Sequence, residues 1–406
     1  MVSPTQMHPR NGAAISRLTA HQSLAFGRPC RPRMMAESHL SDAGRSTMRV
    51  VVALSGGVDS AVSALLLQQA GYDVHALFMK NWEEDDRQGY CAAAADLRDA
   101  EQICERLGLP LHTVNLSSEY WEAVFTPALE SFREGRTPNP DVLCNREIKF
   151  RAFLDHALSL GAIHIATGHY ARILRNAGGY HLLKGLDGDK DQSYFLYRLD
   201  QSQLSRTLFP LGRLNKHTVR RIAFEARLPI HDKKDSTGIC FIGERPFKAF
   251  LSRYLTGRPG DIETVEGKRV GTHDGLAYYT VGQRRGVGIG GQRGGTGNPW
   301  YVVAKDLERN TLIVAQGRTH PSLYAHSLLA EEVHWIADPP PRIPLRCHAK
   351  TRYRQSDQRC QITFCAGERY RVRFDEAQWA LTPGQSIVFY QGEECLGGGT
   401  ICTIVP

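Results

Sequence analysis

The sequence lacks the features that would commit it to a membrane, a disulfide scaffold or a structural metal site. No uncharged apolar run approaches the length of about eighteen residues that spans a bilayer. Its ten cysteines are few for a chain of 406 residues, and they form neither a CxxC pair nor a cluster with histidines at zinc-binding spacing. We therefore expect a cytoplasmic protein in a reducing compartment, with no membrane segment and no structural metal.

Length and charge indicate several domains and an anionic partner. A chain of 406 residues is too long for one ordinary core, so about two or three domains are expected. The net charge of +8 is typical of a protein that meets a polyanion. Half of it lies in residues 1–47, where six Arg face Glu37 and Asp42 (6 − 2 = +4). We interpret this segment as a disordered tail, a transit peptide or a stretch before the true start at Met48.

Strands and helices alternate in the first half of the chain. The apolar runs that predict strands are residues 49–54, 73–79, 110–114 and 163–167. The runs with helical period are residues 60–70, 92–107 and 142–160. Such alternation is typical of an α/β fold with a doubly wound parallel sheet, in which ligands bind at the carboxyl ends of strands near the switch in strand order. We expect the turn at 55–60 and the Gly168-His169 pair at that edge.

After about residue 250 the pattern changes to short alternating runs separated by Gly and Pro. The runs that predict strands are residues 276–281, 301–304, 311–315 and 386–390. We expect a catalytic domain over residues 48–248, a central β-rich module over 249–320 and a C-terminal β-barrel over 321–406. A glycine-rich stretch at 286–297 is predicted to be a mobile loop within this β-rich region.

The clearest chemical signal is a glycine turn between the first predicted strand and the first predicted helix. Residues 54–60 read Leu-Ser-Gly-Gly-Val-Asp-Ser, so backbone N–H groups and the positive helix end converge on one point. Gly56 and Gly57 allow close approach of an anion, and Ser55 and Ser60 add hydroxyl donors. The GxxxxGK[ST] pattern of a Walker loop is absent. Asp59 is either the cap of an empty turn or a group that also helps to hold Mg²⁺ on a pyrophosphate.

Two cysteines have neighbours that suit sulfur chemistry. Asp141 and Cys144 follow a rigid Pro-Asn-Pro loop and lie three apart, with Cys144 in the first turn of a predicted helix. The helix end favours a thiolate and the carboxylate opposes it, so a nucleophile and a buried inert thiol both stay open. Cys240 lies in an apolar tetrad between Gly238 and Gly243, which by itself favours a core strand.

The motifs of the chain together resemble a known family. Residues 55–60 are similar to the signature of the PP-loop ATP pyrophosphatases, which cleave ATP to AMP and pyrophosphate. The motifs that follow are PNPDxLCN, ATGHY, KDQSYFL, DSTGICFIG, TxGQRxG, KTRYRQ and CLGGG. In this order they closely resemble the bacterial tRNA-specific 2-thiouridylases, and the resemblance extends from about Met48 to the C-terminus.

That resemblance implies a reaction and a division of roles. ATP, with Mg²⁺, would adenylate the 2-oxygen of the wobble uridine of tRNA to create a leaving group. A persulfide on Cys240 would then deliver sulfur, Cys144 would resolve it by forming a disulfide, and Asp141 would act as general acid and base. The sulfur would come from a persulfide-carrying donor or relay protein, and the chain would act as a monomer.

The resemblance also assigns binding residues, although position 53 is Ala where relatives often have Gly. The ATP contacts would be Ala53, Leu54, Ser55, Gly56, Gly57, Val58, Asp59, Ser60, Met79 and Gly168. The flipped target base would be held by Asn139, Pro140 and Asp141. The tRNA contacts would be His169, Lys190, Asp191, Gln192, Arg352, Tyr353 and Gln385.

A basic run near the C-terminus has two interpretations. Its members are Arg342, Arg346, Lys350, Arg352 and Arg354, with Tyr353 among them. Such a set suits neutralisation of an RNA backbone plus stacking on bases, and it equally suits a solvated barrel face. The cysteines that match no functional position are interpreted as packing residues, namely Cys91, Cys104, Cys347, Cys360, Cys365, Cys395 and Cys402.

Two other functions are compatible with parts of the sequence. A PP-loop adenylating enzyme of another type, one that forms an amide or modifies RNA differently, would share residues 55–60. In that case Cys144 and Cys240 would have no role, and no glutaminase module is evident. A non-catalytic RNA-binding protein would need only the basic β-rich C-terminal region, but the intact loop with Asp59 argues against it.

Overall fold

The computed structural model describes residues 46–83, 92–235, 247–289, 297–365 and 367–405. Several of the predictions fall outside these residues: nearly all of the 1–47 extension, Cys91, Cys240 and most of the glycine-rich stretch at 286–297. Within the described ranges, no helix is both long and apolar enough to cross a membrane.

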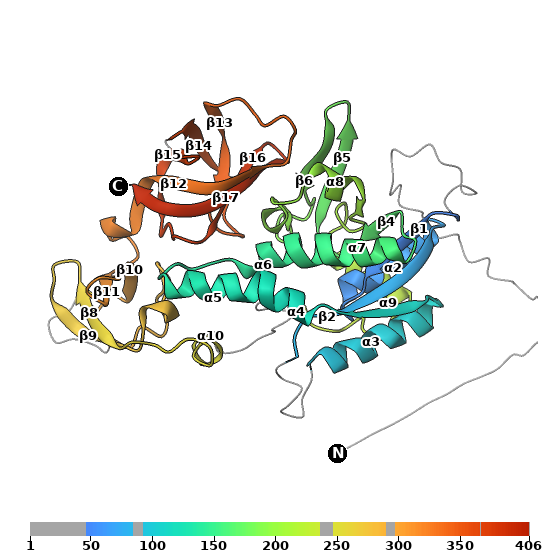
Figure 1. The fold of residues 1–406 in the computed structure, drawn as a ribbon, viewed down its shortest axis with the longest axis horizontal. Coiled ribbons are helices and arrows are strands. Elements are labelled where there is room, and N and C mark those ends of the chain that lie inside the picture. Colours follow the sequence, from blue (N-terminus) through green and yellow to red (C-terminus); the bar gives the residue numbers. More distant parts are fainter. Residues whose placement is uncertain (1–45, 84–91, 236–246, 290–296, 366, 406) are drawn as a thin grey trace, which may run out of the picture. The chain divides into compact units, whose positions relative to one another are not determined.

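The first part of the chain contains a parallel sheet with helices packed around it (Figure 1). Its described strands lie in the order β3-β2-β1-β4-β7. Their bounds are β1 (Arg49–Ala53), β2 (Asp73–Lys80), β3 (Leu111–Asn115), β4 (His164–Ala166) and β7 (Thr207–Leu208). The central strand β1 is buried along Val50, Val51 and Val52, as expected for a sheet covered on both faces. Because β1 pairs in parallel with both β2 and β4, the strand order reverses there, and the predicted doubly wound sheet is confirmed.

Helices connect these strands, and α2 and α3 lie where the sequence predicted them. Their bounds are α2 (Val58–Gln69), α3 (Ala92–Leu107), α4 (Ser117–Tyr120), η2 (Trp121–Phe125), α5 (Thr126–Arg133), η4 (Ser193–Phe195), α8 (Gln201–Ser205) and α9 (Lys216–Glu225). Helix α2 leaves β1 directly and is buried from Ser60 to Leu67. Helix α9 begins at Asn215, whose side chain accepts a hydrogen bond from the Thr218 N–H and so caps the helix.

The predicted helix with Cys144 is present but starts earlier than expected. It is continuous through α6 (Pro140–Leu143), the π-helical η3 (Cys144–Ala152) and α7 (Phe153–Ser159). The prediction that Cys144 lies in its first turn was wrong. Pro140 has a fixed helical φ and no N–H to satisfy, so the helix starts at Pro140 and Cys144 falls in the second turn. The π-helical pairing begins at Cys144, and π-helical segments frequently occur at functional sites.

A smaller sheet follows in the order β10-β11-β8-β9. The bounds here are α10 (Phe247–Leu251), β8 (Gly260–Thr264), β9 (Arg269–His273), η5 (Leu276–Tyr278), β10 (Trp300–Asp306) and β11 (Thr311–Gln316). The strand predicted at residues 276–281 was wrong, since this stretch begins as the 3-10 turn η5. Leu276, Tyr278 and Tyr279 are all buried. The stretch is therefore apolar because an irregular segment packs into the core, and not because it forms a strand.

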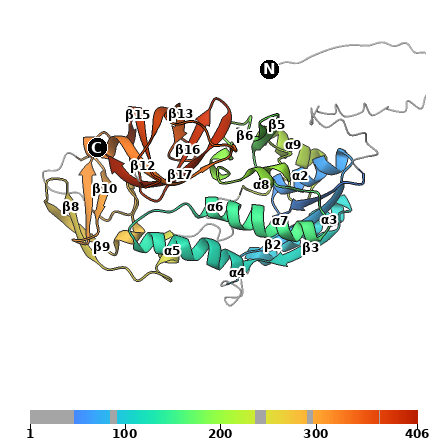
Figure 2. The ribbon, with the colours of Figure 1, turned by 45° about the horizontal axis from the view of Figure 1, so that its top comes forward.

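The C-terminal part is a closed barrel (Figures 1 and 2). The bounds are η6 (Pro321–Leu323), β12 (Tyr324–Trp335), β13 (Leu345–Lys350), β14 (Gln358–Phe364), β15 (Tyr370–Trp379), β16 (Ser386–Gln391) and β17 (Glu394–Val405). Pairing of β12 with both β15 and β17 closes the ring, which confirms the predicted barrel. The hairpin of β5 (Ala171–Asn176) and β6 (Gly179–Lys184) adds to β17, so one sheet joins the barrel to chain that directly follows β4.

Lys305 on β10 is a buried cation whose titration affects stability. Burial lowers the pKa of Lys305 to about 8, and its Nζ donates to the Gly135 carbonyl oxygen at 2.9 Å. In the unfolded chain Lys keeps its proton up to about pH 10, so charged Lys305 opposes folding below pH 8 and this penalty fades between about pH 8 and 10. We predict that Lys305→Met raises the free energy of unfolding by about 1–3 kcal/mol at pH 7 and by less at pH 10, as measured by urea denaturation.

The exposed Lys268 of the same sheet region provides the control, since Lys268→Met should change neither value. Equal destabilisation of Lys305→Met at both pH values would contradict the prediction. It would mean that the hydrogen bond to Gly135, and not burial of the charge, dominates.

Candidate active site

The turn between β1 and α2 offers backbone donors to an anion. The first-turn N–H groups of any α-helix have no intrahelical partner. Gly57 is the N-cap residue of α2, and no side chain of the described residues caps this twelve-residue helix, so its N–H groups are available to an anion. The Ser55 N–H donates to Ser60 Oγ at 3.2 Å, and that hydroxyl donates to the Gly57 carbonyl oxygen at 3.0 Å, which closes the turn. The turn has the form of a phosphate-binding site.

Two glycines let backbone segments meet at this turn without side chains between them. Gly56 has φ +72°, and a Cβ there would lie 2.4 Å from the Asp96 carbonyl oxygen. Gly168 follows β4, and a Cβ there would lie 2.9 Å from the Ser60 nitrogen and 3.1 Å from the Asp59 Cβ. The predicted meeting of the 55–60 turn with Gly168 at the strand-order reversal is therefore present.

Asp59 does not cap α2, so that prediction was wrong. Both of its carboxylate oxygens lie 2.8 Å from Lys216 Nζ on α9, and Oδ1 also accepts a hydrogen bond from the Tyr170 hydroxyl at 2.8 Å. Burial together with the Asp59 charge raises the pKa of Tyr170, so this hydroxyl stays a donor. A partly buried charge cluster therefore lies beside the phosphate turn.

Cys144 lies in the core of the first part of the chain. It is fully buried, in the same cluster as Ile148 and Phe150 of η3. Asp141 stands one turn earlier on α6 and is half-buried. Access of a reactant to Cys144 requires local rearrangement, because its side chain has no exposed surface.

The loop before Asn139 is held by contacts from distant parts of the chain. Lys305 donates to the Gly135 carbonyl oxygen, and the Thr137 N–H donates to that of Pro383 at 2.9 Å. Gln385 Nε2 donates to the carbonyl oxygens of Thr137 and Pro138 at 2.8 and 3.3 Å. Residues 135–138 are therefore fixed by the β10 region and the barrel, and they deliver Asn139, Pro140 and Asp141 to the start of α6.

His169 is buried beside the helix that carries Cys144. Its side chain is 8% exposed, Nδ1 lies 2.7 Å from Thr167 Oγ1, and its ring packs near Phe150 with centroids 5.8 Å apart. Burial and the nearby Lys149 charge lower the pKa of His169 well below its usual value, so the ring is neutral. A neutral imidazole here acts as a hydrogen-bond partner and not as a cation for phosphate.

The predicted tRNA contacts at 190–192 form a turn next to the charge cluster around Asp59. Asp191 is 5% exposed and accepts hydrogen bonds from the N–H groups of Gly185 and Ser193 at 3.0 and 3.1 Å. Gln192 Oε1 accepts from the Tyr170 N–H at 3.0 Å. Lys190 pairs with Asp235 at 2.8 Å. These side chains make internal contacts, and their contact with RNA stays a prediction.

The basic run of the barrel also turns partly inward. Arg352 Nη2 donates to the carbonyl oxygens of Val281 and Ala380 at 3.1 and 2.9 Å, and Lys350 is 9% exposed. The Tyr353 hydroxyl donates to the Lys190 carbonyl oxygen at 3.4 Å, which places Tyr353 beside the 190–192 turn. Arg352 is held by residues of other segments and has no described contact with that turn.

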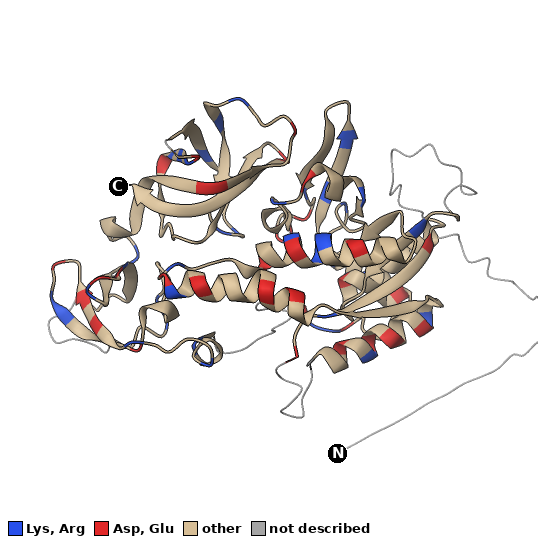
Figure 3. Cartoon of the chain, viewed as in Figure 1, with Lys and Arg blue, Asp and Glu red and all other residues tan. Residues whose placement is uncertain are grey.

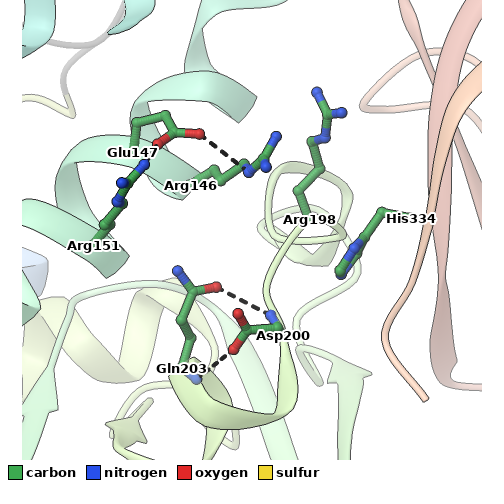
Figure 4. Close-up of a pocket in the computed structure, with 7 residues that line it drawn as sticks. All are labelled: Arg146, Glu147, Arg151, Arg198, Asp200, Gln203 and His334. Atoms are coloured by element: carbon green, nitrogen blue, oxygen red, sulfur yellow. Dashed lines mark hydrogen bonds and ion pairs between the residues drawn. The ribbon is translucent and has the colours of Figure 1, made fainter. Parts of the chain in front are cut away.

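A polar pocket of about 240 Å³ lies on another side of η3 (Figure 4). Its lining residues are Arg146, Glu147, Arg151, Arg198, Asp200, Gln203 and His334. Glu147 pairs with Arg146 and Arg151 at 3.1 and 2.8 Å, and Arg198 pairs with Glu332 at 3.1 Å. Its cations are thus neutralised within the chain. Figure 3 likewise shows Lys and Arg interspersed with Asp and Glu along η3 and α7.

Known proteins match nearly the whole chain. A tRNA-specific 2-thiouridylase, MnmA, from Methylococcus capsulatus is 62% identical over 87% of this chain and 95% of its own length. The proteins of the same name from Nitrosococcus oceani and Klebsiella pneumoniae are 60% and 58% identical, over 87% and 89% of this chain and 97% and 98% of theirs. The chain belongs to the tRNA-specific 2-thiouridylase family.

Three family models match consecutive parts of this 2-thiouridylase chain. They are described as a tRNA methyl transferase HUP domain at residues 48–244, a tRNA methyl transferase PRC-barrel domain at 248–316 and an aminomethyltransferase beta-barrel domain at 325–401. Among solved structures, the U34-tRNA thiolase NcsA from Methanococcus maripaludis matches 51% of this chain and 64% of its own at 17% identity, with a TM-score of 0.32.

The sequence analysis did not identify the polar and charged side chains that surround the phosphate turn. Tyr170 and Lys216 contact Asp59, and Lys233 contacts the Gly56 carbonyl oxygen. Asp235 is linked to Asp59 through Lys216. Two signals pointed to them: Tyr170 ends the ATGHY motif, and Asp235 opens DSTGICFIG. Their partners lie in remote segments, which no local pattern reveals. Met79 is buried in β2, and Cys240 lies outside the described residues.

Gly56 and Gly57 give a matched test of the turn. We predict that Gly56→Ala weakens binding of an ATP analogue at least about tenfold and lowers stability by about 1–3 kcal/mol, because φ is positive and Asp96 leaves no room for Cβ. In Gly57→Ala the new Cβ meets only Ser55 Oγ at 3.5 Å, so stability should change little and binding should weaken less than in Gly56→Ala. Titration calorimetry and thermal melting measure them. Equal behaviour of the two variants would contradict this account of the turn.

Mutation of Gln385 tests whether its hydrogen bonds hold residues 137–138 in place. Gln385→Ala removes both hydrogen bonds to that loop, so we predict that turnover falls about tenfold while the Kd for tRNA changes less than about twofold. Gln391, exposed at the far end of β16, provides the control as Gln391→Ala. A large rise in Kd with unchanged turnover would instead identify Gln385 as an RNA contact.

Proposed function

We propose that this chain uses ATP to replace the 2-oxygen of the wobble uridine of tRNA with sulfur. The observation that carries the proposal is 58–62% identity to tRNA-specific 2-thiouridylases over almost their full length. The intact phosphate turn at 55–60 and the buried Cys144 support it, because the reaction needs a site for pyrophosphate and a thiol.

ATP would bind with its phosphates at the turn. The residues expected to contact it are Ala53, Leu54, Ser55, Gly56, Gly57, Val58, Asp59, Ser60, Met79 and Gly168. Mg²⁺ bound to phosphates takes one or two carboxylates and keeps several waters. Asp59 would supply such a carboxylate only after exchanging Lys216 Nζ, which lies 2.8 Å from both of its oxygens, for the metal ion. Mg²⁺ would neutralise the pyrophosphate as it leaves. No group of three or more His, Cys, Asp or Glu side chains that could hold a metal by itself occurs among the described residues, so the phosphates would have to complete the site.

The first step activates the uridine. Its 2-oxygen attacks the α-phosphorus of ATP, the P–O bond to pyrophosphate breaks, and the base becomes an O-adenylate. Asn139, Pro140 and Asp141 would hold the flipped base, with Asp141 moving the proton. His169, Lys190, Asp191, Gln192, Arg352 and Tyr353 are the proposed tRNA contacts. Gln385 would act on the tRNA site through residues 137–138, to which it donates hydrogen bonds.

The second step transfers sulfur. The terminal sulfur of a Cys240 persulfide attacks C2, and the C2–O bond breaks as AMP departs with the former uridine oxygen. The Cys144 thiolate then attacks Cys240 Sγ, which releases the thiouridine and leaves a Cys144–Cys240 disulfide. Two electrons from an external thiol reductant restore both thiols, and a persulfide-carrying protein reloads Cys240.

The division of labour proposed for the chain is a catalytic domain at 48–248, a central module at 249–320 and an RNA-contacting barrel at 321–406. The ranges of the three family models support similar boundaries. We further infer a monomer that acts in the cytoplasm, where its tRNA substrate and a reducing environment are both present.

The two cysteines test the mechanism. We predict that Cys144→Ser and Cys240→Ser each abolish thiolation and leave the Kd for tRNA nearly unchanged, because a hydroxyl can neither carry nor resolve a persulfide. Cys402→Ser, at a half-buried position, provides the control and should keep full activity. Nucleoside mass spectrometry measures the product and also distinguishes sulfur exchange from an added methyl group. Wild-type yields of thiouridine from either active-site variant would contradict the mechanism.

A further inference from the structure

The chain that leads into Cys240 is fastened to the phosphate turn at Lys233. Lys233 Nζ donates to the Gly56 carbonyl oxygen at 3.1 Å. The same ammonium lies 2.9 Å from an Asp96 carboxylate oxygen and 2.6 Å from one of Asp99, both on α3. Burial would lower the pKa of Lys233, but the hydrogen bonds that its ammonium donates to both carboxylates outweigh burial and raise the pKa, so Lys233 stays charged. One side chain thus joins this segment, the turn and α3.

A second fastening follows two residues later at Asp235. Asp235 Oδ1 lies 2.7 Å from Lys216 Nζ, the ammonium that also contacts both oxygens of Asp59. Asp235 also pairs with Lys190 at 2.8 Å and with Arg220 at 2.7 Å. Burial would raise the pKa of Asp235, but hydrogen bonds from Lys190 and Lys216 outweigh it and lower the pKa to about 2. The carboxylate is therefore ionised at any assay pH above about 5.

The contacts of Asp235 limit the distance between Cys240, the proposed carrier of the persulfide, and the phosphate turn. Cys240 is five residues beyond Asp235 in the sequence, and an extended chain spans at most about 3.3–3.6 Å per residue. The Cα of Cys240 therefore stays within about 18 Å of the Cα of Asp235. Because Lys216 bridges Asp235 to Asp59, that sphere is centred near the phosphate turn. A short tether of this kind raises the effective concentration of its end group at the reaction site.

We propose that Asp235, together with Lys233, is a positioning residue for sulfur transfer, fixing the base of the Cys240 segment to the phosphate turn. The inference rests on the proposed function. Neither side chain needs to touch the uridine, since both act through the length of chain that they anchor. Loss of the anchor should therefore slow sulfur delivery more than adenylation.

The test compares two products of the same reaction. Full-length Asp235→Ala is incubated with unmodified tRNA, ATP and a persulfide donor, and AMP and 2-thiouridine are both quantified. We expect the ratio of thiouridine to AMP to fall about tenfold, because the adenylated base is hydrolysed before sulfur arrives. Asp235→Glu keeps the charge and should restore most of the ratio.

Matched variants separate positioning from general damage. Asp232 and Lys234 are exposed neighbours, so Asp232→Ala and Lys234→Met should keep the wild-type ratio, whereas Lys233→Met should lower it. Arg220→Gln is a milder second probe, because Arg220 pairs with Asp235 and donates to the Lys233 carbonyl oxygen at 3.0 Å. It should lower the ratio as well, and it keeps the test decisive if Asp235→Ala fails to fold.

Two results would overturn the inference: an unchanged ratio in both Asp235→Ala and Arg220→Gln, or an equal fall of AMP and thiouridine in folded protein. The second would make Asp235 part of the ATP site. If the wild-type protein itself makes no thiouridine, the proposed function fails, and that outcome is distinct from either of these.

Discussion

Close backbone packing at the carboxyl end of β1 is the constraint on which the rest of the site depends. Gly56 lies against the Asp96 carbonyl group and Gly168 against the first turn of α2, with no room for a side chain at either contact. Since β1 stands at the reversal of strand order, these contacts form the floor of the ligand edge from main-chain atoms. The side chains that act there must therefore come from farther along the chain, and Tyr170, Lys216 and Asp235 do so.

The same dependence on distant segments explains why the chain needs its later parts. The loop that precedes Asn139 has almost no regular structure of its own, and Lys305, Pro383 and Gln385 hold it. The barrel is in turn continuous with the β5-β6 hairpin, which begins directly after the Gly168 segment. The β-rich parts thus shape the catalytic part, whatever surface they also offer to RNA.

Local patterns predicted the α/β core well. Helix α3 matches its predicted range because its apolar period is a property of the helix alone. The misses depend on partners remote in sequence. Asp59 fits a cap when read locally, yet it pairs with Lys216, which is 157 positions away. Arg352 Nη2 likewise donates to carbonyl groups of two other segments, which no local pattern reveals, and its contact with RNA stays a prediction. A strand at 276–281 was predicted from apolar residues that are buried in an irregular turn.

The pairing of the phosphate turn with sulfur chemistry is the central claim, and the fate of one oxygen atom tests it most directly. A tRNA that carries a heavy oxygen isotope at the 2-position of its wobble uridine is incubated with the protein, ATP and a persulfide donor. The account predicts that the heavy oxygen appears in the phosphate of AMP, in step with thiouridine. Thiouridine formed while AMP stays unlabelled would contradict it, because the uridine oxygen would then have left without adenylation.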